Sequence, residues 1–308
     1  MHNRSFSDYL LLLFKGVAMG IANKIPGVSG GIVAVVTGFY DELIFSFQRL
    51  NFKAVYLLVR GRFLTFWRYI NGAFLITLLL GVIISYFTLS LFLDIALSLY
   101  PLYVWAVFFG LVLASAILLY LNYKKWQAKT IVFALLGLTV GVSLSLMSPS
   151  EQNPKLIYVF LCGVVSIVGM TLPGLSGSFL LILMGNYALI LVDAVNAFGR
   201  WILNTFLGYG TLLPNDNYYA LLFGVFLAGS MVGISGLSAL IHRIQKKAND
   251  ELQAILIGFI FGSLFILWPF NRVALETSVT VKSVFWTIFW GIIGLGIVFA
   301  LDYYERKK

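Results

Sequence analysis

The chain has 308 residues, of which 60% are apolar and only 11% carry a full charge. Soluble domains are about 45–50% apolar and about 25% charged, so this composition excludes a soluble enzyme, a disordered chain and a disulfide scaffold, and leaves an all-α polytopic membrane protein. The net charge of +9 does not indicate a nucleic-acid partner, because the basic residues lie between apolar runs, as they do in cytoplasmic loops.

In chain order, the sequence predicts the same set of elements twice. Each set starts with an apolar region that is broken in its middle, continues with a helix in the membrane interface and ends with three apolar runs. About 20 apolar residues cross a hydrocarbon core about 30 Å thick, so each run is long enough to span, the shorter ones with the help of snorkelling flanks. The first repeat, residues 1–150, holds 8–45, 47–69, 70–93, 101–122 and 130–148. The second repeat, residues 151–308, holds 155–195, 199–214, 218–241, 253–270 and 283–301.

The basic residues indicate how these elements are oriented. If each broken region enters and leaves on the same side, fifteen Lys and Arg side chains lie inside and four lie outside. Cytoplasmic loops carry such an excess, so we expect both termini in the cytoplasm and the protein in the cytoplasmic membrane. Asp94 is expected in the loop after the first span.

A repeated motif supports the duplication. The segment Ile25-Pro26-Gly27-Val28-Ser29-Gly30-Gly31 reappears 147 residues later as Leu172-Pro173-Gly174-Leu175-Ser176-Gly177-Ser178. The same offset pairs Gly16 with Gly163 and Gly38 with Gly185. Because each half has three spans, the second half starts on the opposite face, which predicts an inverted-topology repeat. Secondary transporters often have this architecture and bind their substrate at discontinuous helices near the midplane. An aqueous pore with the same symmetry is the alternative.

The repeated motif has the features of a helical hairpin tip. In each copy the proline ends the arm before it, the glycine permits a sharp reversal, and the serine caps the returning helix. The returning arm from Ser29 to Asp41 is about 18 Å long, so the first hairpin is re-entrant, whereas the arm from Ser178 to Asp193 reaches about 22 Å and either re-enters or spans. The uncovered N–H groups at such a helix start form an anion site. The alternative is that each tip only packs against the bundle.

The predicted phosphate site draws on both tips. Lys24 lies near the first tip, where a charge within the membrane indicates function, and Thr171 offers a hydroxyl group at the equivalent position. The alternative for Lys24 is a contact with a lipid phosphate or a neighbouring carbonyl group. Asn23, Asp41 and Glu42 are candidates for ion coupling or gating, although the two acids also fit solvated charges at the interface. The whole phosphate-binding set is Lys24, Pro26, Gly27, Ser29, Gly30, Gly31, Thr171, Pro173, Gly174, Ser176, Gly177 and Ser178.

No motif in the sequence predicts catalysis. A lipid phosphatase usually needs a histidine, but His2 is terminal and His242 lies at the end of a predicted span, so neither is near the tips. No P-loop is present. With two histidines and the single cysteine Cys162, we expect no catalytic residue, no cofactor and no metal site.

Several segments resemble the polyprenyl-phosphate translocase family, the PopT group. The resemblance lies in residues 16–31, in Gly38 to Ile44, in the second tip and in Gly258 to Leu264. It implies transport of undecaprenyl phosphate, a carrier lipid that returns to the cytoplasmic leaflet during cell-wall assembly, with the tips as the headgroup site. The chain departs from the family pattern at Asn23, where an acid often stands, and at Ile32, where threonine is common. These departures leave ion coupling open.

These observations predict a flippase that works by alternating access at two opposed hairpins, with polyprenyl phosphate and membrane lipids as its partners. The main alternative is a channel or secondary carrier for a small soluble anion. A membrane enzyme that acts on lipid phosphates is the third candidate.

Overall fold

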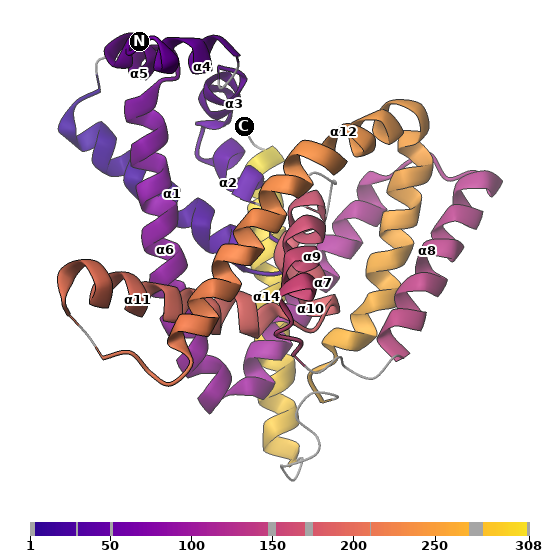
Figure 1. Ribbon diagram of the computed structural model, residues 1–308. Coiled ribbons are helices and arrows are strands. Elements are labelled where there is room, and N and C mark those ends of the chain that lie inside the picture. The colour runs from indigo at the N-terminus through magenta and orange to yellow at the C-terminus, as the bar shows by residue number, and fades with distance from the viewer. Residues whose placement is uncertain are drawn as a thin grey trace. The chain divides into compact units, whose positions relative to one another are not determined.

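The computed structural model describes residues 4–28, 30–49, 52–146, 152–169, 175–209, 211–270 and 280–306. These residues form helices and the turns between them, and no strand occurs in these ranges, which confirms the predicted all-α class. The helices are α1 (Phe6–Lys24), α2 (Gly30–Val36), α3 (Tyr40–Gln48), α4 (Phe52–Val59), α5 (Phe63–Tyr69), α6 (Gly72–Leu99), α7 (Pro101–Asn122), α8 (Ala128–Leu146), α9 (Leu156–Gly169), α10 (Gly177–Leu183), η1 (Leu189–Ala194), α11 (Val195–Leu207), α12 (Asp216–Ser263), η2 (Leu264–Leu267) and α14 (Val281–Arg306) (Figure 1).

Five helical stretches in the described ranges are long and apolar enough to cross a membrane, as expected for a polytopic membrane protein. They are α6, α7, α8, Lys247–Leu267 and Val281–Tyr304, and they match five of the six predicted spans. Helix α6 continues to Leu99, beyond the predicted end of this span at residue 93. Asp94 therefore lies inside a helix, and the prediction of a loop at this residue is wrong.

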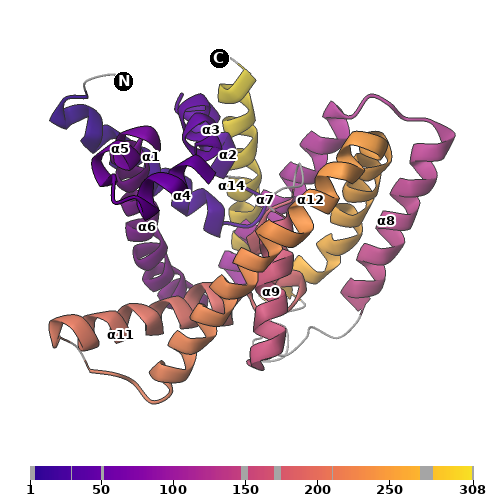
Figure 2. The same ribbon diagram turned by 45° about the horizontal axis from the view of Figure 1, so that its top comes forward.

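Helix α12 runs through two of the predicted spans. Its backbone departs from helical geometry at Ala248 (φ −145°, ψ 47°), so α12 bends there. The part after the bend belongs to the Lys247–Leu267 stretch. The predicted span 218–241 falls on the first part, where the side chains of 234–246 lie outside the described residues, so this span stays a prediction. Helix α12 packs against α8 and α9, which lie beside it in both ribbon views (Figures 1 and 2).

Both apolar regions that contain the motif are broken helices, as predicted. The first breaks between α1 and α2, and the second between α9 and α10. The two short helices α2 and α10 also end alike, at Gly38 with φ 76° and at Gly185 with φ 74°. After each glycine, the next N–H group donates to the carbonyl oxygen five residues earlier, over 3.0 Å in both cases. This is the Schellman ending, in which glycine adopts the left-handed conformation without strain.

Glycines at matching positions allow close contact in two helix pairs. A Cβ atom on Gly81 of α6 would lie 2.2 Å from the carbonyl oxygen of Leu13 in α1. A Cβ atom on Gly229 of α12 would lie 2.1 Å from the carbonyl oxygen of Phe160 in α9. Leu13 and Phe160 are separated by the same 147 residues as the two motifs. These contacts are what a duplicated chain should show, while the predicted inversion of its halves stays a prediction.

The chain forms two compact units. One contains Met1–Ala22, Ser29–Leu89 and Leu301–Lys308, and the other contains Asn23–Val28 and Ser90–Ala300. The core of the first unit includes Leu12, Leu78, Phe39 and Phe74. A core cluster of the second includes Tyr123, Ala254 and Ile257. The segment 23–28, which holds the first tip, therefore belongs to the same unit as Ser176 of the second tip.

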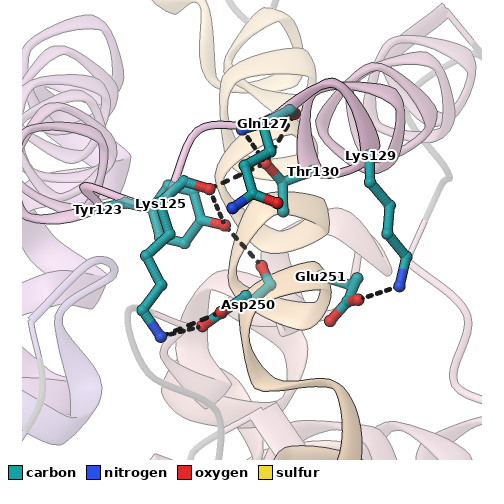
Figure 3. Close-up of polar contacts among 7 residues, drawn as sticks. All are labelled: Tyr123, Lys125, Gln127, Lys129, Thr130, Asp250 and Glu251. Atoms are coloured by element: carbon teal, nitrogen blue, oxygen red, sulfur yellow. Dashed lines mark hydrogen bonds and ion pairs between the residues drawn. The ribbon is translucent and has the colours of Figure 1, made fainter.

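A polar cluster joins the α7–α8 connection to the second part of α12. The ammonium group of Lys125 lies 3.1 and 3.0 Å from the two carboxylate oxygens of Asp250, and Lys129 pairs with Glu251 (Figure 3). The Tyr123 hydroxyl group donates to the backbone carbonyl of Asp250 over 3.1 Å. The cluster fixes the start of α8 against α12 just after the bend.

Helices occur in both regions that were predicted to be interfacial, with different bounds, and their place in the membrane stays a prediction. Two short helices, α4 and α5, occupy the region 47–69, and none of the residues of α5 is buried. Arg60 lies over the ring of Tyr56 at 4.6 Å, a combination of basic and aromatic groups that suits the membrane interface. Helix α11 begins four residues before the predicted region 199–214. It also ends earlier than predicted, because Gly208 terminates it with φ 65°.

Candidate substrate site at the hairpin tips

The first tip is a tight reversal after α1. The helix ends at Lys24, the N–H group of Val28 approaches the carbonyl oxygen of Ile25 at 3.4 Å, and Gly27 has φ 78°. Pro26 is buried at the turn. These positions confirm that the proline ends the first arm and that the glycine makes the reversal.

The second tip shows the predicted serine cap. Ser176 has extended backbone (φ −113°, ψ 146°), and its Oγ accepts a hydrogen bond from the N–H group of Phe179 over 3.2 Å. Such a cap satisfies one of the N–H groups that have no partner within the helix. Helix α10 then begins at Gly177.

The two tips are in direct contact. The N–H group of Gly27 donates to Oγ of Ser176 over 3.0 Å. One oxygen atom of the second tip therefore accepts from its own helix and from the first tip. Oγ of Ser178 lies 3.2 Å from Oγ of Ser176 and extends this polar group along α10.

Two further side chains hold the first tip. The hydroxyl group of Ser115 in α7 donates to the carbonyl oxygen of Gly27 over 2.6 Å. The hydroxyl group of Tyr187, after α10, donates to the carbonyl oxygen of Lys24 over 3.2 Å. The Tyr187 ring packs edge-on against Phe108 of α7, with ring centroids 5.4 Å apart. The first tip is thus held between α7 and the second hairpin.

The polar groups at the tips are shielded from solvent. Lys24 is 0% exposed, Ser178 is 1% exposed and Ser176 is 6% exposed. Burying a cation or a hydroxyl group is costly unless it has polar partners. The tips therefore hold several hydrogen-bond donors and the lysine Lys24 in a buried position, where such groups are costly unless they have polar partners.

The structure brings together six of the predicted phosphate-binding residues, which are Lys24, Pro26, Gly27, Ser176, Gly177 and Ser178. Four others, Ser29, Thr171, Pro173 and Gly174, lie outside the described residues. Gly30 and Gly31 form the first residues of α2, in the other compact unit. Asn23 is in the last turn of α1.

The two acidic candidates of the first hairpin differ in their surroundings. Asp41 is exposed at the start of α3. Glu42 pairs with Arg4 and accepts a hydrogen bond from Asn71 over 2.8 Å. The hydrogen bond to Glu42 raises the pKa of Arg4. Glu42 therefore has a structural role in joining α3 to the chain segment before α1.

Two residues that touch the tips were not among the predicted site residues. Ser115 and Tyr187 appear in the sequence only as repeat positions, Ser115 opposite Ser263 and Tyr187 opposite Tyr40. Ser263 is fully buried and donates to a carbonyl group of its own helix, so the repeat alone does not single out Ser115 as a tip contact. Among the described residues, no three His, Cys, Asp or Glu side chains gather where they would hold a metal ion.

Comparison with known proteins places both tips inside a matched region. Residues 19–283 match the VCA0040-like family, described as undecaprenyl phosphate translocase-like. A polyprenyl-phosphate transporter of Vibrio cholerae serotype O1 is 32% identical over 265 residues, which are 86% of this chain and 79% of that protein. A polyprenyl-phosphate transporter of Staphylococcus aureus is 27% identical over 269 residues, which are 83% of this chain and 85% of that protein. No solved structure matches the chain.

Proposed function

The chain belongs to the undecaprenyl phosphate translocase-like family, and on this premise we propose that it moves undecaprenyl phosphate between the leaflets of the cytoplasmic membrane. The family match agrees with the resemblance seen in the sequence. Relatives named polyprenyl-phosphate transporters support the substrate class. The direction that suits a carrier lipid is its return to the cytoplasmic leaflet, with both termini of the protein in the cytoplasm.

The headgroup site lies at the two tips. The observation that carries this assignment is the hydrogen bond from Gly27 N–H to Ser176 Oγ, because it joins the two predicted halves of the site. A phosphate monoester accepts several hydrogen bonds, and each bond to a charged group contributes about 1.5–3 kcal/mol. Lys24, the two serine hydroxyl groups and the Gly27 N–H group would supply them. Binding would exchange the bond between the tips for bonds to the phosphate.

Alternating access follows from the same contact. If the two hairpins approach the midplane from opposite faces, separation of the tips on one side opens the site to one leaflet. The matching glycine contacts and Schellman endings support this duplicated arrangement. The prenyl tail would remain in lipid, and translocation needs no covalent step, so we assign no enzymatic activity.

A leaflet-exchange assay in vesicles tests this function. Undecaprenyl phosphate should exchange faster in vesicles that contain the protein, and unphosphorylated undecaprenol should not. Equal acceleration of both lipids would contradict phosphate recognition. Uptake of inorganic phosphate into sealed vesicles distinguishes the alternative, a carrier of small anions, because only such a carrier would transport free phosphate.

Substitutions at the tips test the site. Lys24→Met and Ser176→Ala should slow the exchange of undecaprenyl phosphate. Ser145→Ala is the matched control, because its hydroxyl group also makes partly buried helix contacts, to the carbonyl oxygens of Gly141 at 2.8 Å and Gly262 at 3.2 Å. Exchange that is unchanged in both tip variants would refute the site while leaving the transport activity intact.

A further inference from the structure

A second polar cluster lies where the last turns of α6 meet η1 and the start of α11. The hydroxyl group of Ser90, which is fully buried, lies 3.0 Å from the carbonyl oxygen of Leu191 and 2.9 Å from that of Val192. Asp94 follows Ser90 by four residues in α6 and so lies on the same face of that helix. The Ser90 contacts therefore place Asp94 next to the segment that contains Asp193 and Asn196.

The segment that faces Asp94 has unusual backbone geometry. Residues Leu189–Ala194 form a π-helix. This kind of helix is rare in proteins, and where it occurs it is often at a functional site. Ser90 donates to carbonyl groups within this segment, so the wide turn has a specific side-chain partner in α6. Asp193 lies in the π-helix, and Asn196 follows in the first turn of α11.

Asn196 has one amide atom satisfied and one not. Its Nδ2 lies 3.5 Å from Oδ2 of Asp94, so the amide nitrogen faces this carboxylate. The residue is only 6% exposed. Its Oδ1 has no hydrogen-bond partner among the described residues. Native proteins rarely leave a buried carbonyl oxygen in this condition, because it loses its bonds to water without replacement. A cation is one ligand that would satisfy this oxygen.

The charges of the cluster favour a cation. Asp193 lies three residues before Asn196, so the two side chains are on the same side of this segment. Arg200 is the nearby cation, but its guanidinium group bonds to Asp216 over 2.8 Å from Nε and 2.6 Å from a terminal nitrogen. This pair lowers the pKa of Asp216, which keeps its negative charge. The guanidinium group of Arg200 is therefore engaged by Asp216, which leaves Asp94 and Asp193 as the carboxyl groups that another cation would meet.

We propose that Asp94, Asp193 and Oδ1 of Asn196 bind a metal cation. Two carboxylates and an amide carbonyl are oxygen ligands of the kind that hard cations such as Na⁺, Mg²⁺ and Ca²⁺ prefer. Asp94 is exposed, so the site is open on one side, where the ion can enter and where water can complete its coordination. This site differs from the sequence-based expectation of no metal, which rested on the scarcity of histidine and cysteine.

Thermal unfolding of the purified full-length protein tests the site without any lipid substrate. After treatment with a chelator, the protein is measured in choline chloride and then with NaCl, MgCl₂ or CaCl₂ at constant ionic strength. A ligand that binds only the folded state raises Tm in a saturable way. We expect such a rise with at least one of these cations. Equilibrium dialysis with the radioactive ion should then give one bound ion per chain.

Variants locate the ion. Asp94→Asn, a change at an exposed residue, and Asn196→Ala should abolish the rise in Tm and the bound ion. Asp302→Asn is the control, because it removes a carboxylate that pairs with Arg306 in α14, and it should keep both. No rise with any of the cations, or an equal rise in Asp94→Asn, would overturn the proposal. A rise in Tm that Asn196→Ala retains would overturn it too. Because no readout involves transport, failure here is distinct from failure of the proposed function.

Discussion

The Gly27→Ala substitution tests how closely the first tip must fit between α7 and the second hairpin. Gly27 has φ 78°, and a residue with a Cβ atom in this conformation costs about 1–2 kcal/mol. The new Cβ atom would also lie 3.0 Å from the carbonyl oxygen of Leu111 and 3.1 Å from Oγ of Ser115. Overpacking of this kind costs about 1–3 kcal/mol. We therefore expect a loss of at least about 2 kcal/mol in unfolding free energy.

Gly61→Ala provides the matched control. Gly61, between α4 and α5, has φ 68°, but a Cβ atom there would meet no heavy atom within 4 Å. This substitution should lower the unfolding free energy only by the cost of the left-handed backbone conformation, about 1–2 kcal/mol. The difference between the two variants therefore isolates the crowding at the tip from the backbone strain that both share.

Two measurements separate the expected outcomes. Thermal unfolding in detergent, followed by tryptophan fluorescence, should give Gly27→Ala the lower Tm, with a shift of about 1.5 °C per kcal/mol. Leaflet exchange of undecaprenyl phosphate should fall several-fold in Gly27→Ala and stay near the wild-type rate in Gly61→Ala. If the two variants have the same Tm and the same exchange rate, close packing of the tip does not matter and the reasoning is refuted.

Three other predictions concern single contacts. Ser115→Ala removes the hydroxyl group that donates to Gly27, and should lower the unfolding free energy by about 1 kcal/mol and slow lipid exchange; normal exchange would show that this contact is dispensable. Asp216 has a pKa lowered by Arg200, so its contribution to stability is full above the unfolded value of about 3.9 and is lost as the pH falls through the folded value. Asp216→Asn should therefore flatten the dependence of Tm on pH in the acidic range, and an unchanged profile would contradict this. Gly258→Leu puts a Cβ atom 1.9 Å from a carbonyl oxygen of α8 and should lower the unfolding free energy by about 1–3 kcal/mol; a Tm equal to that of the wild type would contradict this contact.

The sequence predicted the tips well because their structure follows local rules. Pro26 and Gly27 fix the end of α1 and the reversal by their own backbone preferences, and Ser176 caps α10 through a bond to a residue three positions away. The spans were predicted for a similar reason, since length and apolar composition decide whether a helix suits the bilayer. Their bounds were less accurate, because an apolar run does not show where a helix stops.

The contacts between distant segments were beyond such reasoning. Ser115 reaches Gly27 across 88 residues, and Tyr187 reaches Lys24 across 163. No periodicity in the sequence marks these two side chains among the chain's other serines and tyrosines. The cluster around Asn196 was missed because it depends on a π-helix and on the continuation of α6 to Asp94, and neither has a pattern in the sequence.

The contact between the hairpins also sets how easily they part. The hydrogen bonds that link them include two between neutral groups, Gly27 to Ser176 and Tyr187 to Lys24. Each contributes about 1 kcal/mol, so together they favour contact by a factor of about 30. By themselves, these two bonds would therefore give the joined tips only a modest advantage over separated ones. A carrier that must expose its site to each leaflet in turn benefits from such a modest bias, because a stronger latch would hold the site closed and a weaker one would leave it open.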